Sequence, residues 1–172
     1  PEHARLGKTT ILLKLIEDTA DEHGSDFPHA YIDHPTIGVD EMIAQITEMI
    51  SGLKPSQNKV ENLATLKNAL IAGKMEGGRN IIVIDEGQML CDARPVLQEL
   101  RALINLTYNG EYLHTFILSG QKALWDTLQE MPEFWQRMPV RYYFTPLRFE
   151  ETRELIRYRL NKAGLDVARE IF

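Results

Sequence analysis

The stretch Ile81-Ile82-Val83-Ile84-Asp85-Glu86-Gly87-Gln88 decides the fold class of this chain. Its four apolar residues favour a strand, and two carboxylates follow them at once. A strand that is apolar on both faces is typical of the middle of a parallel sheet that helices cover on both sides. Residues 81–84 therefore predict an α/β fold with a mainly parallel sheet flanked by helices.

The segments on either side of this strand indicate the same class, because helical periodicity alternates with short runs of β-branched or aromatic residues. Gly164 is well suited to end the last of the predicted helices. The helices are expected over residues 7–22, 39–53, 60–73, 94–108, 122–138 (interrupted at Pro132) and 150–163, and the strands over 29–33, 80–85, 113–119 and 140–144.

The composition excludes several classes of protein. The chain has 172 residues, of which 44% are hydrophobic and 26% charged, with a net charge of −6. This acidic balance disfavours nucleic-acid binding through overall charge. The single Cys91 excludes an internal disulfide and a cysteine zinc site, which fits a reducing compartment. No apolar run approaches the roughly 20 residues of a membrane span, so we expect a soluble cytoplasmic domain.

A candidate phosphate-binding motif, Gly7-Lys8-Thr9-Thr10, opens the first predicted helix and matches the end of G-x-x-x-x-G-K-[ST]. Glycine lets backbone N–H groups approach phosphates, Lys8 would reach the β- and γ-phosphates, and the Thr9 hydroxyl would ligate Mg²⁺. The motif is incomplete, because Glu2 stands where the first glycine belongs and no strand precedes it. The alternative is an ordinary helix start with a solvated lysine.

The carboxylates after the apolar strand form the second motif, which in P-loop ATPases is the Walker B element. Asp85 would hold Mg²⁺ on the Thr9 side, and Glu86 would polarise the attacking water as the catalytic base. The alternative is a strand that ends in a polar turn, with Gly87 supplying the bend. The two motifs together, in strand–helix order, favour one metal–phosphate site.

Two further sets of residues are candidates for catalysis. Ser119 and Gln121 follow the next buried strand, at the same sheet edge as Asp85, where either would sense the γ-phosphate or orient the water. The alternative is a strand that leaves into a loop. Arg137 and Arg141 have the side chain suited to phosphoryl oxygens, and a neighbouring subunit would supply such an arginine finger in trans. The alternative for each arginine is a surface ion pair.

The order of these elements resembles the AAA+ ATPases of the ExeA type, the general secretion pathway protein A family, over nearly the whole chain. The motifs are far more specific together than any one alone. The segments that carry the resemblance are Pro1-Glu2-His3-Ala4, Gly7-Lys8-Thr9-Thr10, Ile84-Asp85-Glu86-Gly87-Gln88, residues 98–106, Leu118-Ser119-Gly120-Gln121, residues 136–142, residues 146–152, Tyr158-Arg159-Leu160 and Ala163-Gly164.

The resemblance implies a RecA-like core (residues 1–147), the beginning of a helical lid (residues 148–172), ATP hydrolysis and action as an oligomer. It implies Lys8 and Thr9 as nucleotide ligands, Asp85 as the Mg²⁺ residue and Glu86 as the catalytic base. Arg137 resembles the family's finger arginine, with Arg141 as its competitor.

The chain departs from the family pattern at its front, where Arg5-Leu6 runs straight into Gly7-Lys8. In the family a strand and the first loop glycine lie between these segments. We therefore expect that residues are missing between about Leu6 and Gly7. The family also reads Asp-Glu-Ala-Gln where this chain has Gly87, and Val-Gly-Gln where it has Ser119.

The resemblance predicts a role in coupling ATP hydrolysis to the assembly of a partner complex, as in secretion. It would place the chain in the cytoplasm or in the cytoplasmic part of an inner-membrane protein. A related AAA+ regulator of DNA transposition, which binds DNA as an oligomer, shares all the motifs. The lack of a clustered Lys/Arg stripe disfavours DNA. A scaffold without catalysis is the third possibility, and the retention of both Asp85 and Glu86 disfavours it.

Overall fold

The computed structural model describes residues 7–24, 27–36 and 38–164 of the chain. These residues divide into two compact units, Gly7–Arg141 and 142–164. The expected break between core and lid after residue 147 stays a prediction. The segment Pro1-Glu2-His3-Ala4 and the junction at Leu6 lie outside the described residues, as do residues 165–172.

The first unit is built around a parallel sheet of three strands in the order β1-β2-β5. The strands are β1 (His29–Ile32), β2 (Ile81–Ile84) and β5 (Thr115–Leu118), and they run in register, with Ile84 between Ile32 and Leu118. All four residues of β2 are buried, which confirms the predicted central position of this strand. The register also places the carboxyl ends of the three strands level with one another.

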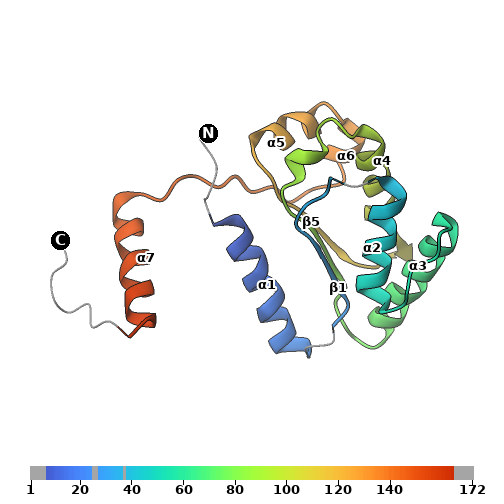
Figure 1. The fold of residues 1–172 in the computed structure, drawn as a ribbon, viewed down its shortest axis with the longest axis horizontal. Coiled ribbons are helices and arrows are strands. Elements are labelled where there is room, and N and C mark those ends of the chain that lie inside the picture. Colours follow the sequence, from blue (N-terminus) through green and yellow to red (C-terminus); the bar gives the residue numbers. More distant parts are fainter. Residues whose placement is uncertain (1–6, 25–26, 37, 165–172) are drawn as a thin grey trace. The chain divides into compact units, whose positions relative to one another are not determined.

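The two faces of the sheet carry different layers of helix, because side chains alternate between the faces of a strand. On one face, Ile81 and Val83 of β2 pack in a small cluster with Leu12 of α1 (Lys8–His23). On the other, Ile82 and Ile84 join the larger core. The helices of that core are α2 (Val39–Ser51), α3 (Lys59–Met75), α4 (Arg94–Ile104), α5 (Lys122–Gln129) and α6 (Pro132–Trp135), with the short 3₁₀ turn η1 (Gly87–Leu90) (Figure 1).

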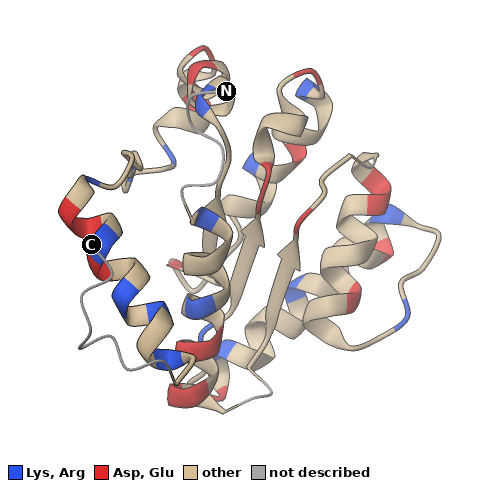
Figure 2. Ribbon diagram, turned by 60° about the vertical axis from the view of Figure 1, so that its left-hand side comes forward, with Lys and Arg blue, Asp and Glu red and all other residues tan. Residues whose placement is uncertain are grey.

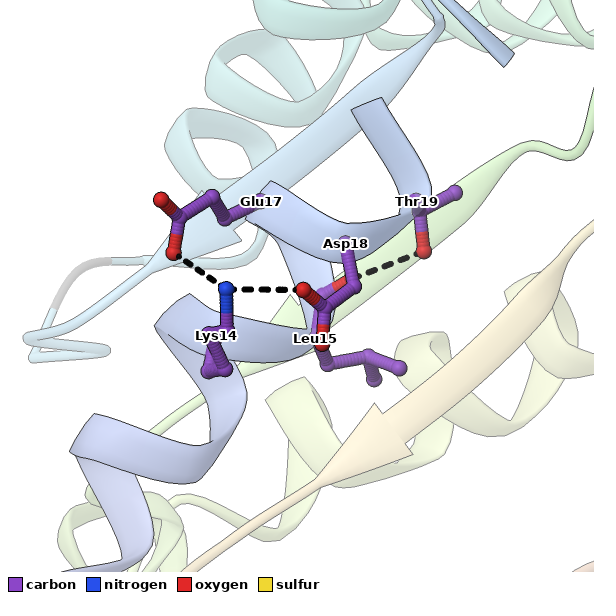
Figure 3. Close-up of polar contacts among 5 residues, drawn as sticks. All are labelled: Lys14, Leu15, Glu17, Asp18 and Thr19. Carbon is purple, nitrogen blue, oxygen red and sulfur yellow. Dashed lines mark hydrogen bonds and ion pairs between the residues drawn. The ribbon is translucent and has the colours of Figure 1, made fainter. Parts of the chain in front are cut away.

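Side chains of α1 make local polar contacts within the helix. Lys14 Nζ lies 3.0 Å from Glu17 Oε2 and 2.8 Å from Asp18 Oδ1, one helical turn further on (Figure 3). Thr19 donates its hydroxyl to the carbonyl oxygen of Leu15 at 2.8 Å (Figure 3). Exposed pairs of this kind contribute only a few tenths of a kcal/mol each. The position of α1 therefore depends on its apolar face against the sheet.

The predicted helix over 94–108 is wrong at its end, because α4 stops at Ile104. A two-stranded hairpin follows, with β3 (Thr107–Tyr108) antiparallel to β4 (Glu111–Tyr112). Asn109 and Gly110 connect the strands with φ values of 51° and 82°. Asn-Gly is the pair that best tolerates two successive positive φ angles, so this dipeptide sets the hairpin.

The chain after β5 also differs in part from expectation. The helix predicted over 122–138 is interrupted as expected before Pro132, and it forms the separate helices α5 and α6, the second ending at Trp135. The strand predicted over 140–144 is absent, which is a correction. A strand needs a neighbour for its N–H and C=O groups, and among the described residues none pairs with this segment, which crosses the boundary between the units.

The second unit contains α7 (Phe149–Lys162), which confirms the last predicted helix. Its start is capped by the carboxylate of Glu151, whose Oε2 accepts the N–H of Arg148 at 2.7 Å. Gly164 follows with a φ of 81°, the left-handed conformation that glycine adopts most readily at a helix end. The helix therefore has well-defined signals at both ends.

Candidate functional site

The two predicted motifs meet at one point of the first unit. The hydroxyl Oγ1 of Thr9, in the first turn of α1, donates to Oδ2 of Asp85 at 2.6 Å. Asp85 lies directly after β2, and it is in contact with Thr9 across 76 residues of sequence. Figure 2 shows acidic positions beyond the arrowheads of two neighbouring strands, at the edge that Asp85 shares. The arrangement brings a helix N-terminus and a strand-end carboxylate together.

Asp85 is a buried carboxylate with an exposed fraction of 1%. Burial alone would raise its pKa, but hydrogen bonds from the Thr9 hydroxyl and the Glu86 backbone N–H outweigh burial and hold the pKa below its ordinary value. The Glu86 N–H donates to Oδ1 at 2.9 Å. The carboxylate is thus kept charged, and these hydrogen-bond donors are neutral. A divalent cation fits such a site, because it supplies the positive charge that these donors lack.

Tyr31, in β1, is a third hydrogen-bond donor to this carboxylate. Its hydroxyl donates to Asp85 Oδ2 at 3.1 Å, and burial together with the charge of Asp85 raises the pKa of Tyr31 to about 12. The sequence reasoning missed this residue. The signal was the predicted strand over 29–33, since adjacent parallel strands in register bring Tyr31 beside Val83, two residues before Asp85.

Glu86 combines an unusual backbone with a specific side-chain contact. Its φ of 50° and ψ of 33° lie in the left-handed region, where a non-glycine residue costs about 1–2 kcal/mol. Such conformations cluster at functional sites. Its carboxylate Oε2 accepts Nε2 of Gln88 at 2.5 Å. Sequence reasoning did not give Gln88 a role, and the Asp-Glu-Gly-Gln stretch was the place to look for one.

The N-terminus of α1 supplies the features that a phosphate group needs. Gly7 precedes the helix with a φ of 81°, and a Cβ there would meet open space, so its conformation and not crowding favours glycine. Gly7, which precedes the first turn, has no side chain to cap it, and the backbone N–H groups at the start of a helix favour an anion. Lys8 is half-buried and Thr10 is exposed in the same turn. The structure therefore presents all four motif residues at one helix end.

Ser119 and Gln121 follow β5 at the same edge of the sheet. The Ser119 carbonyl accepts the Gly87 N–H at 2.8 Å, and the Gln121 N–H donates to Oε1 of Gln88 at 3.0 Å. The Ser119 hydroxyl lies close enough to Asp85 to help lower the pKa of that carboxylate. Its Oγ is buried, and it makes no well-formed hydrogen bond with any described residue. Of the two candidates, Ser119 is therefore the one placed beside Asp85.

The two candidate finger arginines lie apart from Asp85. Arg137 is exposed in the turn after α6. Arg141 stacks on Trp135, with its guanidinium carbon 4.0 Å from the ring centroid, and it donates Nη2 to the Trp135 carbonyl at 2.6 Å. Among the described residues, neither arginine contacts Thr9, Asp85 or Glu86. These contacts occupy Arg141 within its own chain, whereas the exposed Arg137 is accessible to a neighbour.

The number of acidic ligands limits which metal fits. Among the described residues, no three His, Cys, Asp or Glu side chains gather as ligands for an ion. Mg²⁺ suits such a site, because it is bound through one or two carboxylates together with substrate phosphates and water. The Thr9 hydroxyl and the Asp85 carboxylate are the oxygen donors present.

A parallel sheet flanked by helices, with a Gly-Lys-Thr helix start against a strand-end Asp-Glu pair, defines a P-loop NTPase. The particular family follows from the sequence as a whole. The family model described as an AAA domain matches residues 3–128, and the chain belongs to that family.

Individual proteins resemble the chain at different levels. It is 29% identical over 161 residues to general secretion pathway protein A of Aeromonas hydrophila. The matched region covers 92% of the chain but only 28% of that relative. Two solved structures share the fold. One is a Walker-type ATPase of Pyrococcus abyssi, with a TM-score of 0.61 and 18% identity, and the match covers 95% of the chain and 53% of that structure. The other is the ORC2 protein of Aeropyrum pernix in ADPNP and ADP complexes, with a TM-score of 0.67 and 16% identity, and the match covers 92% of the chain and 43% of that structure.

These similarities describe an AAA-type ATPase module that resembles part of a longer secretion-pathway protein. No helix in the described ranges has both the length and the apolarity that crossing a membrane requires.

Proposed function

We propose that the unit Gly7–Arg141 binds ATP with Mg²⁺ and hydrolyses it. The contact between Thr9 Oγ1 and Asp85 Oδ2 at 2.6 Å is the single observation that carries the proposal. It joins the residue types that bind a phosphate and a metal at the N-terminus of a helix, where backbone N–H groups favour an anion.

Each chain residue has a distinct role in the proposed reaction. Gly7, Lys8, Thr9 and Thr10 would bind the phosphates, with Lys8 holding the γ-phosphate as it reacts. Thr9 and Asp85 would hold Mg²⁺, which neutralises charge on the phosphate oxygens when bound. Glu86 would accept a proton from the water whose oxygen attacks the γ-phosphorus, while the bond to the ADP oxygen breaks. Ser119 would orient the γ-phosphate or the water.

The wider role follows the similarity to general secretion pathway protein A. The module would act as a homo-oligomer, with Arg137 of a neighbouring subunit stabilising the transition state, and would couple hydrolysis to the assembly of a partner complex. Residues 148–164 would begin a helical lid.

Hydrolysis of ATP by wild type and by Glu86→Gln tests the proposal. We expect Glu86→Gln to bind ATP with affinity within twofold of wild type and to lose on the order of a hundredfold or more in kcat, because the amide cannot accept the proton. Equal kcat in wild type and Glu86→Gln would remove Glu86 as the base.

A further inference from the structure

We propose that Gln88 is a positioning residue for hydrolysis, which ties the carboxylate of Glu86 to the backbone of the turn after β5. The inference rests on the proposed function, because it gives Gln88 a role only if Glu86 acts as the base.

The side-chain amide of Gln88 makes two bonds in opposite directions. Nε2 donates to Glu86 Oε2 at 2.5 Å, and Oε1 accepts the backbone N–H of Gln121 at 3.0 Å. These partners fix which end of the amide is nitrogen, because a carboxylate can only accept and an N–H can only donate. The flipped amide would lose both bonds, so a single orientation of Gln88 is favoured.

The two segments that Gln88 connects are packed too closely for side chains. A Cβ on Gly120 would lie 3.1 Å from both the backbone N and Oε1 of Gln88, and 2.7 Å from a methyl group of Leu124. A Cβ on Gly87 would lie 3.0 Å from the Ser119 carbonyl oxygen. Glycines at both positions thus allow the turn after β5 to lie directly against Glu86-Gly87-Gln88, and Gln88 bonds across this contact.

The bond from Gln88 determines which carboxylate oxygen of Glu86 faces the water. Gln88 takes up Oε2, which leaves Oε1 to accept a proton from water. Because the same amide is bonded to the turn at Gln121, a shift of that turn is passed to the Glu86 carboxylate. The left-handed backbone of Glu86, with φ of 50°, gives this side chain a fixed starting direction as well. Gln88 therefore sets the orientation of the base without contacting the nucleotide.

Substitution of Gln88 by methionine tests this role, since methionine has similar length and makes neither bond. We expect kcat for ATP to fall on the order of tenfold, the effect of losing one hydrogen bond to a charged group, while KM stays within twofold. Met89→Leu is the matched control in the same turn, because Met89 is exposed and should leave both constants unchanged. A fall in kcat with an unchanged melting temperature separates positioning from folding.

A second variant reaches the same link from its other end. Gln121→Pro removes the N–H that Gln88 accepts, and the Gln121 φ of −86° lies about 20° from the −65° that proline favours. We expect Gln121→Pro to lower kcat in the same direction, and the double variant to lose no more than Gln88→Met alone. Additive losses in the double variant would contradict one shared link.

The outcomes separate this inference from the proposed function. Wild type without ATP hydrolysis would overturn the function itself. Active wild type together with wild-type kcat in Gln88→Met would overturn only the role of Gln88.

Discussion

At the scale of single residues, the central feature of the site is the buried, charged carboxylate of Asp85. Asp85 is almost fully buried, yet neutral donors from three segments, Thr9, Tyr31 and the Glu86 N–H, hold it in its charged form. Burying a carboxylate without a cation is costly, so such a residue is retained where a cation binds. The same donors also fix the direction of its two oxygens.

Glu86 gives a prediction at this scale, because its backbone is left-handed. Both Glu86→Ala and Glu86→Gly remove the carboxylate, but only glycine adopts a φ of 50° without strain. We expect Glu86→Gly to unfold with a free energy about 1 kcal/mol higher than Glu86→Ala, the reverse of the order in helices. Urea denaturation of both variants measures the difference. Equal stability would show that no strain is stored there.

At the scale of elements, the sequence predicted the parts whose pattern is local and repeated. The apolar run of β2 and the periodicity of α2 and α3 identified the sheet and its helices, and strand-end positions identified Asp85 with Ser119. The hairpin at Asn109-Gly110 was missed because its two-residue strands carry no periodicity. The Gln88 link was missed because it depends on an approach between η1 and the turn after β5, which only the packed structure reveals.

The contact between α3 and the start of β2 gives a prediction about packing. A Cβ on Gly73 would lie 2.5 Å from Asn80 Oδ1 and 2.9 Å from Pro28 Cγ. Asn80 cannot move easily, because its Nδ2 donates to the carbonyls of Leu70 and Leu113 at 2.7 Å each. We expect Gly73→Ala to lower the free energy of unfolding by about 1–2 kcal/mol, despite the better helix propensity of alanine.

Gly38→Ala is the control for this prediction. A Cβ on Gly38 meets nothing within 4 Å, so the change in unfolding free energy should stay below about 1 kcal/mol. Urea denaturation measures both variants. A Gly73→Ala protein as stable as wild type would contradict the tight contact.

His114, next to β5, gives a prediction about pH. Burial lowers its pKa from 6.5 to about 4, and neither ring nitrogen has a hydrogen-bond partner among the described residues. Below pH 6.5 this side chain is protonated in the unfolded chain but stays neutral in the folded chain. The free energy of unfolding therefore falls as the pH is lowered from 6.5 to 4. The loss reaches about 3 kcal/mol. We expect His114→Phe to weaken the dependence of the unfolding free energy on pH, measured by urea denaturation across that range. An unchanged dependence would contradict a buried neutral His114.

At the scale of the whole molecule, the chain matches only 28% of the length of general secretion pathway protein A, so the role of that whole relative is a proposal for this chain. The unit Gly7–Arg141 contains Thr9, Asp85 and Glu86 but brings neither Arg137 nor Arg141 to them among the described residues. We propose that Arg137 of a neighbouring copy completes the site.

Mixed oligomers test this assignment. We expect Arg137→Ala to lower kcat on the order of a thousandfold, the usual effect of a finger arginine, and Arg141→Ala to have a much smaller effect, because Arg141 is bound to Trp135. Mixing Arg137→Ala with Glu86→Gln subunits should restore part of the activity, since some interfaces then join an intact Glu86 to an intact Arg137. A mixture as inactive as its components would contradict an arginine acting in trans.

The most direct test of the central claim, one metal–phosphate site shared by Thr9 and Asp85, is the effect of Mg²⁺ on ATP affinity, measured by calorimetric titration of the full-length protein with and without the ion. In wild type we expect Mg²⁺ to tighten ATP binding on the order of tenfold or more. In Thr9→Val and Asp85→Asn the gain from Mg²⁺ should largely disappear, while Tyr31→Phe, which removes only one hydrogen bond to Asp85, should keep most of it. An equal gain from Mg²⁺ in wild type, Thr9→Val and Asp85→Asn would contradict the account.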